Sequence, residues 1–460
     1  MTMHHNLAER LDRVHWNQFH STVTIALGIG WLLDAFEVTI VNNVIGVFKY
    51  MWHLSNTQAS WILSIWFVGL MIGAYGFGFL ADRFGRRRLF LLTLLIYGVF
   101  TLLTAFAWNF ESVLVLRLLT AIGVGAEYSA INAAISEFIP ARNRGKANAT
   151  VMNFWPLGAI LAALVSLYVV NLLPPDIGWR VAFGFGALVA ASTAFVRKSI
   201  PESPRWLMSQ GDLAGAERVV SRIEQGRGRW HAHNSPAGGS RRAPFGVWEQ
   251  TRTLVTRHPG RLALGCLLDF SEAAGYYGLF AFLALFILPA VHVSSHFAPF
   301  FYLIGNLGAL IGGLIVALVL DRAGRKLTVP VFYTLAAMGA LLLAASIETH
   351  SWVWVLAAFT LANLFATGGW ISAYPTFSEL FPTHLRSTGI GISVAVGRIG
   401  AFAAPLVLTA VADTYGMVAA LVVLASFWLI GAVAMVPWMM YGVEGKGRSL
   451  EAMDAGNLVS

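Results

Sequence analysis

The chain carries about twelve long apolar stretches, and each is long enough to cross the hydrocarbon core of a bilayer as a helix of about 20 residues. Only 12% of its residues are charged and 57% are hydrophobic, whereas about 25% of the residues in a soluble globular chain are charged. The first stretch follows a polar leader, so we expect it to remain as a helix and not to be cleaved as a signal peptide. The sequence therefore predicts an all-α membrane protein with twelve transmembrane helices, at 20–47, 58–80, 88–108, 112–139, 147–171, 181–199, 260–288, 297–320, 327–347, 351–378, 386–411 and 416–440.

The positions of Lys and Arg predict the orientation of these helices. With the N-terminus inside, 27 of the 31 Lys and Arg residues fall in cytoplasmic segments, where transmembrane proteins accumulate them. Lys49 and Arg180 lie in outer loops, and Arg117 and Arg398 lie within predicted helices. We therefore expect a multi-pass protein of the cell inner membrane with both termini in the cytoplasm. Because the basic residues are spread over every inner loop, the net charge of +8 does not indicate a nucleic-acid partner.

A hydrophilic stretch divides the apolar segments into two sets of about six. Its middle is rich in Gly, Ser, Pro and Arg, which is typical of a flexible linker, and apolar residues at helical spacing flank it at Asp212–Gln225 and Phe245–Arg257. We expect these two flanking pieces to be amphipathic helices at the inner membrane face. The predicted domains are an N-terminal bundle (1–199), a cytoplasmic linker (200–259), a C-terminal bundle (260–442) and a cytoplasmic tail (443–460).

The two halves repeat each other. The segment Gly30–Glu37 matches Gly265–Glu272 at five of eight positions, including both acids, with an offset of 235 residues. Asp82 recurs as Asp321 after 239 residues, and Glu137 and Arg144 recur as Glu379 and Arg386 after 242. Nearly constant offsets indicate duplication, and such repeats commonly place the substrate site at their interface near the bilayer midplane. We therefore expect two pseudo-symmetric six-helix bundles.

Three motifs resemble those of the major facilitator superfamily, in its sugar-porter-like branch. GFLADRFGRRR at Gly78–Arg88 resembles the signature loop after the second helix, although its second copy has Ala317 where Gly is usual. PESPRWL at Pro201–Leu207 and VEGKGRSLE at Val443–Glu451 are similar to the paired inner-face motifs of that branch. The resemblance implies the twelve-helix fold of that superfamily and transport by alternating access.

Within this branch the sequence differs from true sugar transporters. Around Glu272 the segment SEAAGYYGLF lacks the Gln pair and Asn that sugar porters usually have there. Instead, LLDAFE at Leu32–Glu37 resembles the D-G-Y-D of aromatic-acid and related metabolite:proton symporters. The resemblance implies a proton-coupled symporter of a small organic metabolite, more consistent with a carboxylate anion than with a neutral sugar.

Five ionisable residues inside predicted helices are candidates for proton coupling: Asp34, Glu37, Arg117, Asp269 and Glu272. Charges at the bilayer centre cost several kcal/mol, so each is a functional hypothesis. Within each acid pair, a spacing of three residues places both carboxylates on one helical face. We expect a cluster of Asp34, Glu37 and Arg117 whose pairing changes with protonation. The alternative is a permanent salt bridge that holds helices together.

The candidate substrate-binding residues are Glu127, Arg398, Tyr276, Tyr277, Trp370 and Tyr374. A guanidinium group binds a carboxylate through two parallel hydrogen bonds, which suits Arg398 to an anionic substrate. Arg398 could equally balance Asp269 or Glu272, and Glu127 could pair with a neighbouring helix. The aromatic residues could line the cavity or pack within the helix bundle.

Repeated charges at the predicted cytoplasmic helix ends resemble the interhelical latch of the superfamily. This resemblance implies that they favour the outward-open state, whereas the alternative is that they only set the orientation of the helices. The predicted latch comprises Asp82, Arg83, Arg86, Glu137, Arg144, Asp321, Arg322, Arg325, Glu379 and Arg386.

No motif indicates an enzyme, a cofactor site or a metal site. The histidines lack metal-ligand spacing on one helix face, and no phosphate-binding loop follows a strand. We expect a transporter that works as a monomer in the lipid bilayer, with a small molecule and protons as its ligands. The remaining alternatives are a sugar or polyol carrier, a proton-driven exporter and a membrane sensor that has lost transport.

Overall fold

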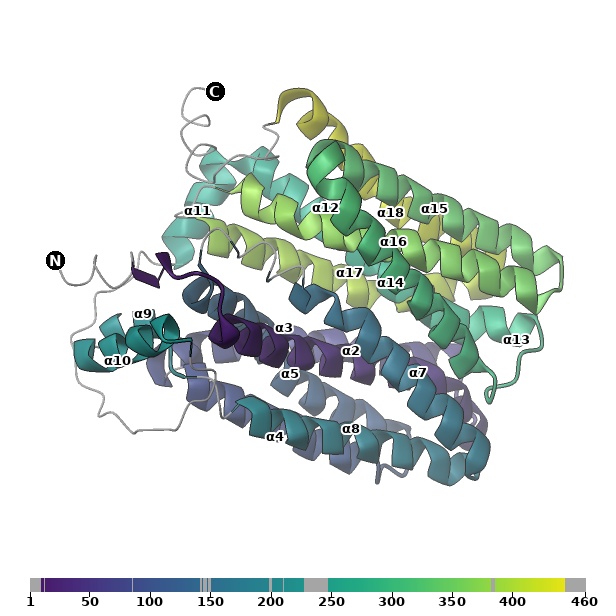
Figure 1. Ribbon diagram of the computed structural model, residues 1–460. Helices are drawn as coiled ribbons and strands as arrows, with labels where there is room; N and C mark the ends of the chain where they lie inside the picture. The colour runs from purple at the N-terminus through teal and green to yellow at the C-terminus, as the bar shows by residue number, and fades with distance from the viewer. Residues whose placement is uncertain are drawn as a thin grey trace. The chain divides into compact units, whose positions relative to one another are not determined.

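Helices account for nearly all regular structure in the computed structural model, which describes residues 10, 11, 13–84, 86–140, 143, 147, 150–197, 201–209, 211–226, 247–381 and 385–442. Within these ranges twelve helices have at least 19 residues, which confirms the predicted all-α fold (Figure 1). They are α2 (Gln18–Trp52), α3 (Asn56–Phe84), α4 (Arg86–Thr104), α5 (Phe110–Phe138), α7 (Phe154–Leu172), α8 (Pro175–Arg197), α12 (Pro259–Phe282), α14 (Ala298–Ala323), α15 (Arg325–Glu348), α16 (Trp352–Leu380), α17 (Arg386–Tyr415) and α18 (Met417–Tyr441).

Many of these helices meet the requirements for crossing a membrane. In the described ranges, nine are long and apolar enough to do so, beginning with Gln18–Trp52 and ending with Met417–Tyr441. Helices suit this environment because each satisfies its own backbone hydrogen bonds where water is absent. Four shorter helices complete the described fold: α9 (Pro204–Ser209), α10 (Leu213–Glu224), α11 (Val247–Arg257) and α13 (Leu288–Ala290), the last joined to α12 by a π-helix, η2 (Leu283–Ile287).

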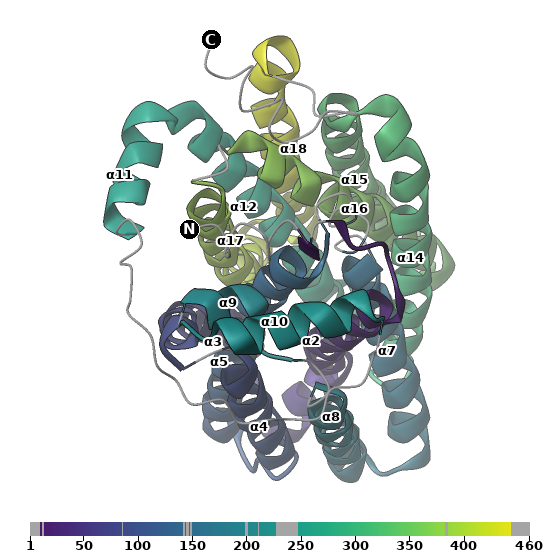
Figure 2. The ribbon, with the colours of Figure 1, turned by 60° about the vertical axis from the view of Figure 1, so that its left-hand side comes forward.

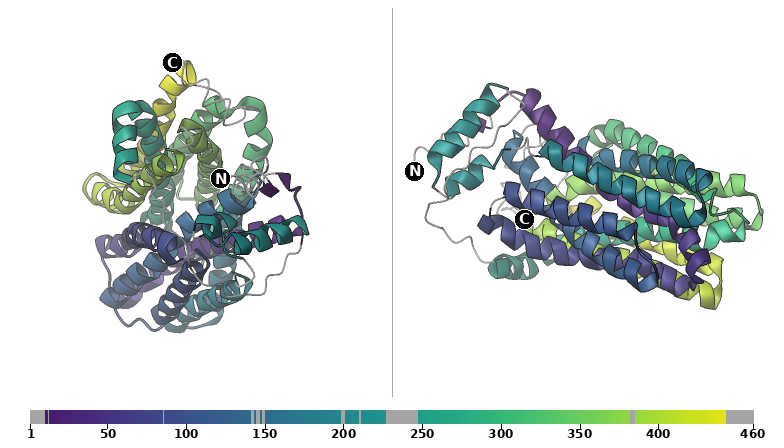
Figure 3. Two further views of the ribbon diagram at one scale, coloured as in Figure 1. Left: turned by 90° about the vertical axis from the view of Figure 1, so that its left-hand side faces the viewer. Right: turned by 90° about the horizontal axis from the view of Figure 1, so that it is seen from below.

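The chain forms two compact units, and the first comprises residues 1–37, 68–158 and 180–244. In this unit α4 runs beside α5 (Figure 3). Glycines allow α3 and α5 to approach closely, because a Cβ atom at Gly73 would lie 2.1 Å from the Ile122 carbonyl oxygen. A Cβ atom at Gly125 would likewise lie 2.2 Å from the Leu70 carbonyl oxygen. These backbones therefore pack at a separation that only glycine permits.

The second unit comprises residues 38–67, 159–179 and 245–460. In it α12 packs against α17 and α18, and α15 packs against α16 and α18 (Figure 1). The first part of α3 also belongs here, since the hydroxyl oxygens of Ser60 and Thr409 lie 2.6 Å apart and both side chains are buried. The division of the chain into two six-helix bundles, a linker and a tail remains a prediction.

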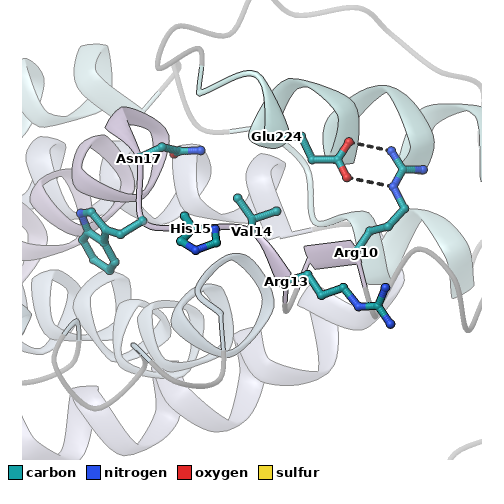
Figure 4. A pocket seen from close by; sticks show the side chains of 7 residues that line it. Arg10, Arg13, Val14, His15, Asn17 and Glu224 are labelled. Carbon is teal, nitrogen blue, oxygen red and sulfur yellow. Dashed lines mark hydrogen bonds and ion pairs between the residues drawn. The ribbon is translucent and has the colours of Figure 1, made fainter.

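The segment before α2 is clamped to α10 by an arginine. Arg10 donates hydrogen bonds to both carboxylate oxygens of Glu224, at 2.7 and 2.9 Å, and one to Glu217 at 2.7 Å. Figure 4 shows the paired contact with Glu224. These hydrogen bonds lower the pKa of Glu224 and raise the pKa of Arg10. In the same region α9 packs against α10 (Figure 2). Helices α10 and α11 occupy the segments predicted to be amphipathic helices.

Candidate functional site

The first group of candidate residues lies where α2 and α5 meet. Asp34 and Glu37 are one helical turn apart on α2, and their side chains are 2% and 1% exposed. Arg117 of α5 is 2% exposed, and its Nη1 donates a hydrogen bond of 3.2 Å to Glu37 Oε2. The structure therefore joins Glu37 and Arg117 in a buried ion pair.

Helix α4 supplies polar groups around this pair. The Tyr97 hydroxyl donates to the Leu33 carbonyl oxygen at 3.4 Å, which fixes the Tyr97 side chain against α2. One turn later on α4, the buried Thr101 lies close enough to the Glu37 carboxylate to interact with it. Desolvating an ion pair is costly, and only close geometry with further hydrogen-bonding partners offsets that cost. The ion pair and its α4 neighbours form a buried polar centre among the long apolar helices of this unit.

The second group lies where α12 meets α17. Asp269 and Glu272 of α12 and Arg398 of α17 are 4%, 6% and 8% exposed. The charge of Arg398 acts on both carboxylates, so the three groups form one electrostatic cluster. Gly397, which precedes Arg398, makes this approach possible, because a Cβ atom there would lie 1.8 Å from Asp269 Oδ2.

Buried aromatic residues stand beside this cluster. Tyr374 of α16 lies close enough to Asp269, Glu272 and Arg398 for their charges to act on its hydroxyl group. The centroid of its ring lies 5.8 Å from that of Trp370. Trp370 lies 6.3 Å from Tyr276, and Tyr276 lies 5.3 Å from Tyr277. At these centroid distances the four rings form a continuous aromatic wall along α12 and α16. The four predicted aromatic residues of this half are therefore brought together.

Most of the predicted latch lies outside the described side chains. The latch residues whose side chains lie outside the described part are Asp82, Arg83, Arg86, Glu137, Arg144, Asp321, Glu379 and Arg386. The side chain of Glu127, from the predicted binding set, also lies outside it. Of the two latch residues whose side chains are described, Arg322 is exposed and Arg325 is half-buried. The latch thus remains a prediction. The described residues contain no group of His, Cys, Asp and Glu that could hold a metal ion.

Several polar residues that the structure places at or near helix interfaces were not predicted from the sequence. The Tyr97 hydroxyl donates to the Leu33 carbonyl oxygen, one residue before Asp34, and Thr101 lies close enough to Glu37 to interact with it. The Tyr333 hydroxyl donates to the Leu268 carbonyl oxygen at 3.1 Å, one residue before Asp269. The adjacent pair Asn42 and Asn43 is buried in α2. A signal for this pair was available, since two consecutive amides in an apolar helix are costly unless they are satisfied or functional.

Comparison with known proteins identifies the family. The family model described as "Sugar (and other) transporter" matches residues 34–456. The niacin transporter of Acinetobacter baylyi is 31% identical over 454 residues, which cover 97% of this chain and 99% of that protein. The 3-(3-hydroxy-phenyl)propionate transporter of Escherichia coli is 28% identical, covering 82% of this chain and 83% of that protein.

A solved structure supports the same fold. The inward-open xylose transporter from E. coli superposes with a TM-score of 0.74 at 18% identity, covering 95% of this chain and 99% of that one. At this identity the likeness concerns the fold alone. Together with the family match over most of the chain, these findings establish that the chain has the major facilitator fold, belongs to the sugar (and other) transporter family and is a membrane transporter of small metabolites.

Proposed function

We propose that this chain is a proton-coupled symporter of single-ring aromatic carboxylates, with nicotinate as the first candidate substrate. The observation that carries the proposal is the α12–α17 cluster, in which Asp269, Glu272 and Arg398 lie beside an aromatic wall. The relatives that transport niacin and 3-(3-hydroxy-phenyl)propionate support a ring with a carboxylate as the substrate class.

The charges of this cluster suit an anion that enters together with a proton. When all three groups are ionised, two carboxylates face one guanidinium, so the cluster carries an excess negative charge. A substrate carboxylate that reaches Arg398 in this state is repelled by both acids. Protonation of Asp269 or Glu272 removes one negative charge, so that the guanidinium group can pair with the substrate carboxylate. Binding of the anion and of a proton therefore favour each other.

The aromatic wall can pack against the ring of the substrate. Trp370, Tyr374 and Tyr276 are each less than 10% exposed and lie in sequence along the wall. Stacked or edge-to-face aromatic pairs add about 0.5–1.5 kcal/mol beyond the burial of area. A hexose has no aromatic ring and cannot form aromatic pairs of this kind.

We further propose that the protein lies in the cell inner membrane as a monomer with both termini in the cytoplasm. The distribution of Lys and Arg along the chain supports this orientation, because 27 of these 31 residues then face the cytoplasm. Lys49 and Arg180 would then lie on the outer side.

The experiment is uptake of radiolabelled nicotinate into proteoliposomes with an acidic exterior. We expect uphill accumulation that collapses when a protonophore dissipates the gradient, and no accumulation of neutral nicotinamide. Accumulation that is unaffected by the protonophore would refute proton coupling, and uphill transport of nicotinamide would refute anion selectivity.

Variants of the α12–α17 cluster test whether its residues bind nicotinate and couple its uptake to protons. Arg398→Gln should raise the KM for nicotinate by about tenfold or more, since a hydrogen bond to a charged group contributes about 1.5–3 kcal/mol. Glu272→Gln should keep nicotinate exchange while losing uphill accumulation. The matched control is Glu348→Gln, which removes an exposed carboxylate at the end of α15 and should change neither property. Equal effects of Glu272→Gln and Glu348→Gln would remove Glu272 from the mechanism.

A further inference from the structure

A separate cavity of about 190 Å³ lies in the second unit, between the last turns of α2 and the segment that runs from η2 through α13 to the start of α14. We name it the Lys49 cavity, because Lys49 is the one charged residue among the described residues that line it. An apolar protein cavity of about 150 Å³ is large enough to bind benzene. The Lys49 cavity can therefore accept a single six-membered ring with a small substituent.

Two buried asparagines form part of the polar lining of this cavity. Asn42 and Asn43 line it and are 6% and 0% exposed. Asn42 Nδ2 donates to the Val38 carbonyl oxygen at 2.8 Å, and Asn43 Nδ2 donates to Ser166 Oγ at 3.0 Å. The Oδ1 atoms of both have no hydrogen-bond partner among the described residues.

The orientation of each amide follows from these contacts. Val38 offers Asn42 a carbonyl oxygen, which can only accept, and Ala162 offers Asn43 another at 3.4 Å. The amide nitrogens must therefore face these carbonyls, which leaves the Oδ1 atoms as the groups that remain to be satisfied. A buried acceptor without a partner costs about 1–3 kcal/mol, so the pair favours a ligand that donates hydrogen bonds.

Lys49 contributes a positively charged hydrogen-bond donor, whereas the two asparagines contribute acceptors. Its ammonium donates to Asn56 Oδ1 and lies near enough to Asp413 for their charges to interact. An ammonium has three donor hydrogens, so donors beyond the bond to Asn56 are available. The cavity thus combines a cationic donor with two neutral acceptors, a set that matches an anion carrying a hydroxyl or N–H group.

The wall opposite α2 contains irregular helix geometry. The π-helix η2 contributes Ala284, and α13 contributes Leu288 and Pro289. Single π-turns within α-helices occur frequently at functional sites. Gly46 allows the following loop to approach α2, since a Cβ atom at Gly46 would lie 3.2 Å from Ser295 Cβ. These features shape the apolar part of the cavity around a ring.

We propose that the Lys49 cavity is a second binding site for single-ring carboxylates that carry a hydroxyl or N–H donor, with Lys49 binding the carboxylate and the Asn42 and Asn43 amide oxygens accepting from the donor. The substrate class rests on the proposed function. In the proposed orientation this site lies on the outer side, distinct from the α12–α17 cluster, and holds the substrate before or after it occupies that cluster.

Equilibrium dialysis of the purified full-length protein with radiolabelled 4-hydroxybenzoate and benzoate tests this site, because the two acids differ only by a hydroxyl donor. We expect two molecules of 4-hydroxybenzoate per chain and one of benzoate. Arg398→Gln should remove one 4-hydroxybenzoate site and leave the other. Ala284→Phe, which fills the cavity, should remove that other site, and Lys49→Gln should weaken it about tenfold.

The matched control is Arg180→Gln. Arg180 is the other basic residue of the predicted outer loops. It donates to the Ala105 carbonyl oxygen and is not among the residues that line this cavity. This variant should keep both sites. Lys49→Gln removes a partly exposed side chain, so it tests the site even if Ala284→Phe does not fold.

Four results would overturn one or both proposals. A single site that Arg398→Gln removes, while Ala284→Phe and Lys49→Gln leave it unchanged, would overturn the Lys49 site and leave the proposed function intact. Two sites that are insensitive to both cavity variants would also overturn it, as would equal stoichiometry for benzoate. No binding of either acid to the unaltered protein would overturn both proposals.

Discussion

Removing one partner of the buried Glu37–Arg117 ion pair should destabilise the protein far more than removing both. Both side chains are no more than 2% exposed, and their closest atoms are 3.2 Å apart. Glu37→Leu leaves an uncompensated guanidinium in the membrane interior, and Arg117→Met leaves an uncompensated carboxylate. Breaking a buried pair in this way costs about 3–5 kcal/mol, whereas replacing both partners by apolar residues of similar volume is often neutral.

The assay is the free energy of unfolding in mixed detergent micelles containing increasing SDS, for the unaltered protein, both single variants and the double variant. We expect each single variant to lose about 3–5 kcal/mol and the double variant to recover most of that loss. If the double variant loses as much free energy of unfolding as the two single variants together, Glu37 and Arg117 do not stabilise the fold as a pair.

Transport by the same variants distinguishes a coupling role from a structural one. If the pair only ties α2 to α5, the stable double variant should accumulate substrate uphill. If the pair opens and closes with protonation, the double variant should be stable but unable to accumulate substrate. Glu37→Gln should then lose uphill accumulation and keep some exchange, while Arg117→Ala should damage both. Uphill accumulation by Glu37→Gln would exclude Glu37 as the coupling acid.

Two further predictions concern packing and pH. Gly397→Ala should lower stability by about 1–3 kcal/mol and impair transport, because its Cβ atom would collide with Asp269 Oδ2, whereas Gly391→Ala on the same helix meets nothing within 4 Å and should be tolerated; equal melting temperatures for the two variants would refute this. Arg10 lowers the pKa of Glu224, so Glu224 should stabilise the protein above its unfolded pKa of about 4.3 and lose this effect as pH falls through the lower folded pKa. The difference in melting temperature between the unaltered protein and Glu224→Gln should therefore persist from pH 8 to 5 and shrink below about pH 4, and a constant difference throughout would contradict it.

The sequence was sufficient to predict the helices because the membrane imposes a strong constraint. A bilayer requires about 20 consecutive apolar residues, and the chain meets this requirement repeatedly. The spacing of three between Asp34 and Glu37 also implied that both face the same way, and the structure places both in the unit interior. Helical periodicity and the cost of burying charge were enough for these inferences.

The partners of Arg398 could not be chosen from the sequence alone. Its neighbours depend on how closely α12 and α17 approach, and that distance depends on the absence of a side chain at Gly397. The sequence contained the glycine but gave no reason to pair it with Asp269. The Lys49 cavity escaped prediction for a similar reason, since it arises where α2 meets an irregular segment of the α12 region. Hydrophobic patterns do not specify such local gaps in packing.

The two acid pairs are repeats of each other, but their arginines are not. The matching segments Gly30–Glu37 and Gly265–Glu272 each supply two carboxylates from the first helix of a half. Arg117 comes from α5, the fourth long helix of the chain, whereas Arg398 comes from α17, the eleventh. Duplication can therefore account for the acids but not for their partners. Because Arg117 already donates to Glu37 while Arg398 lies beside an aromatic wall, we propose that the α2 pair responds to protons and that the α12 cluster also receives the substrate.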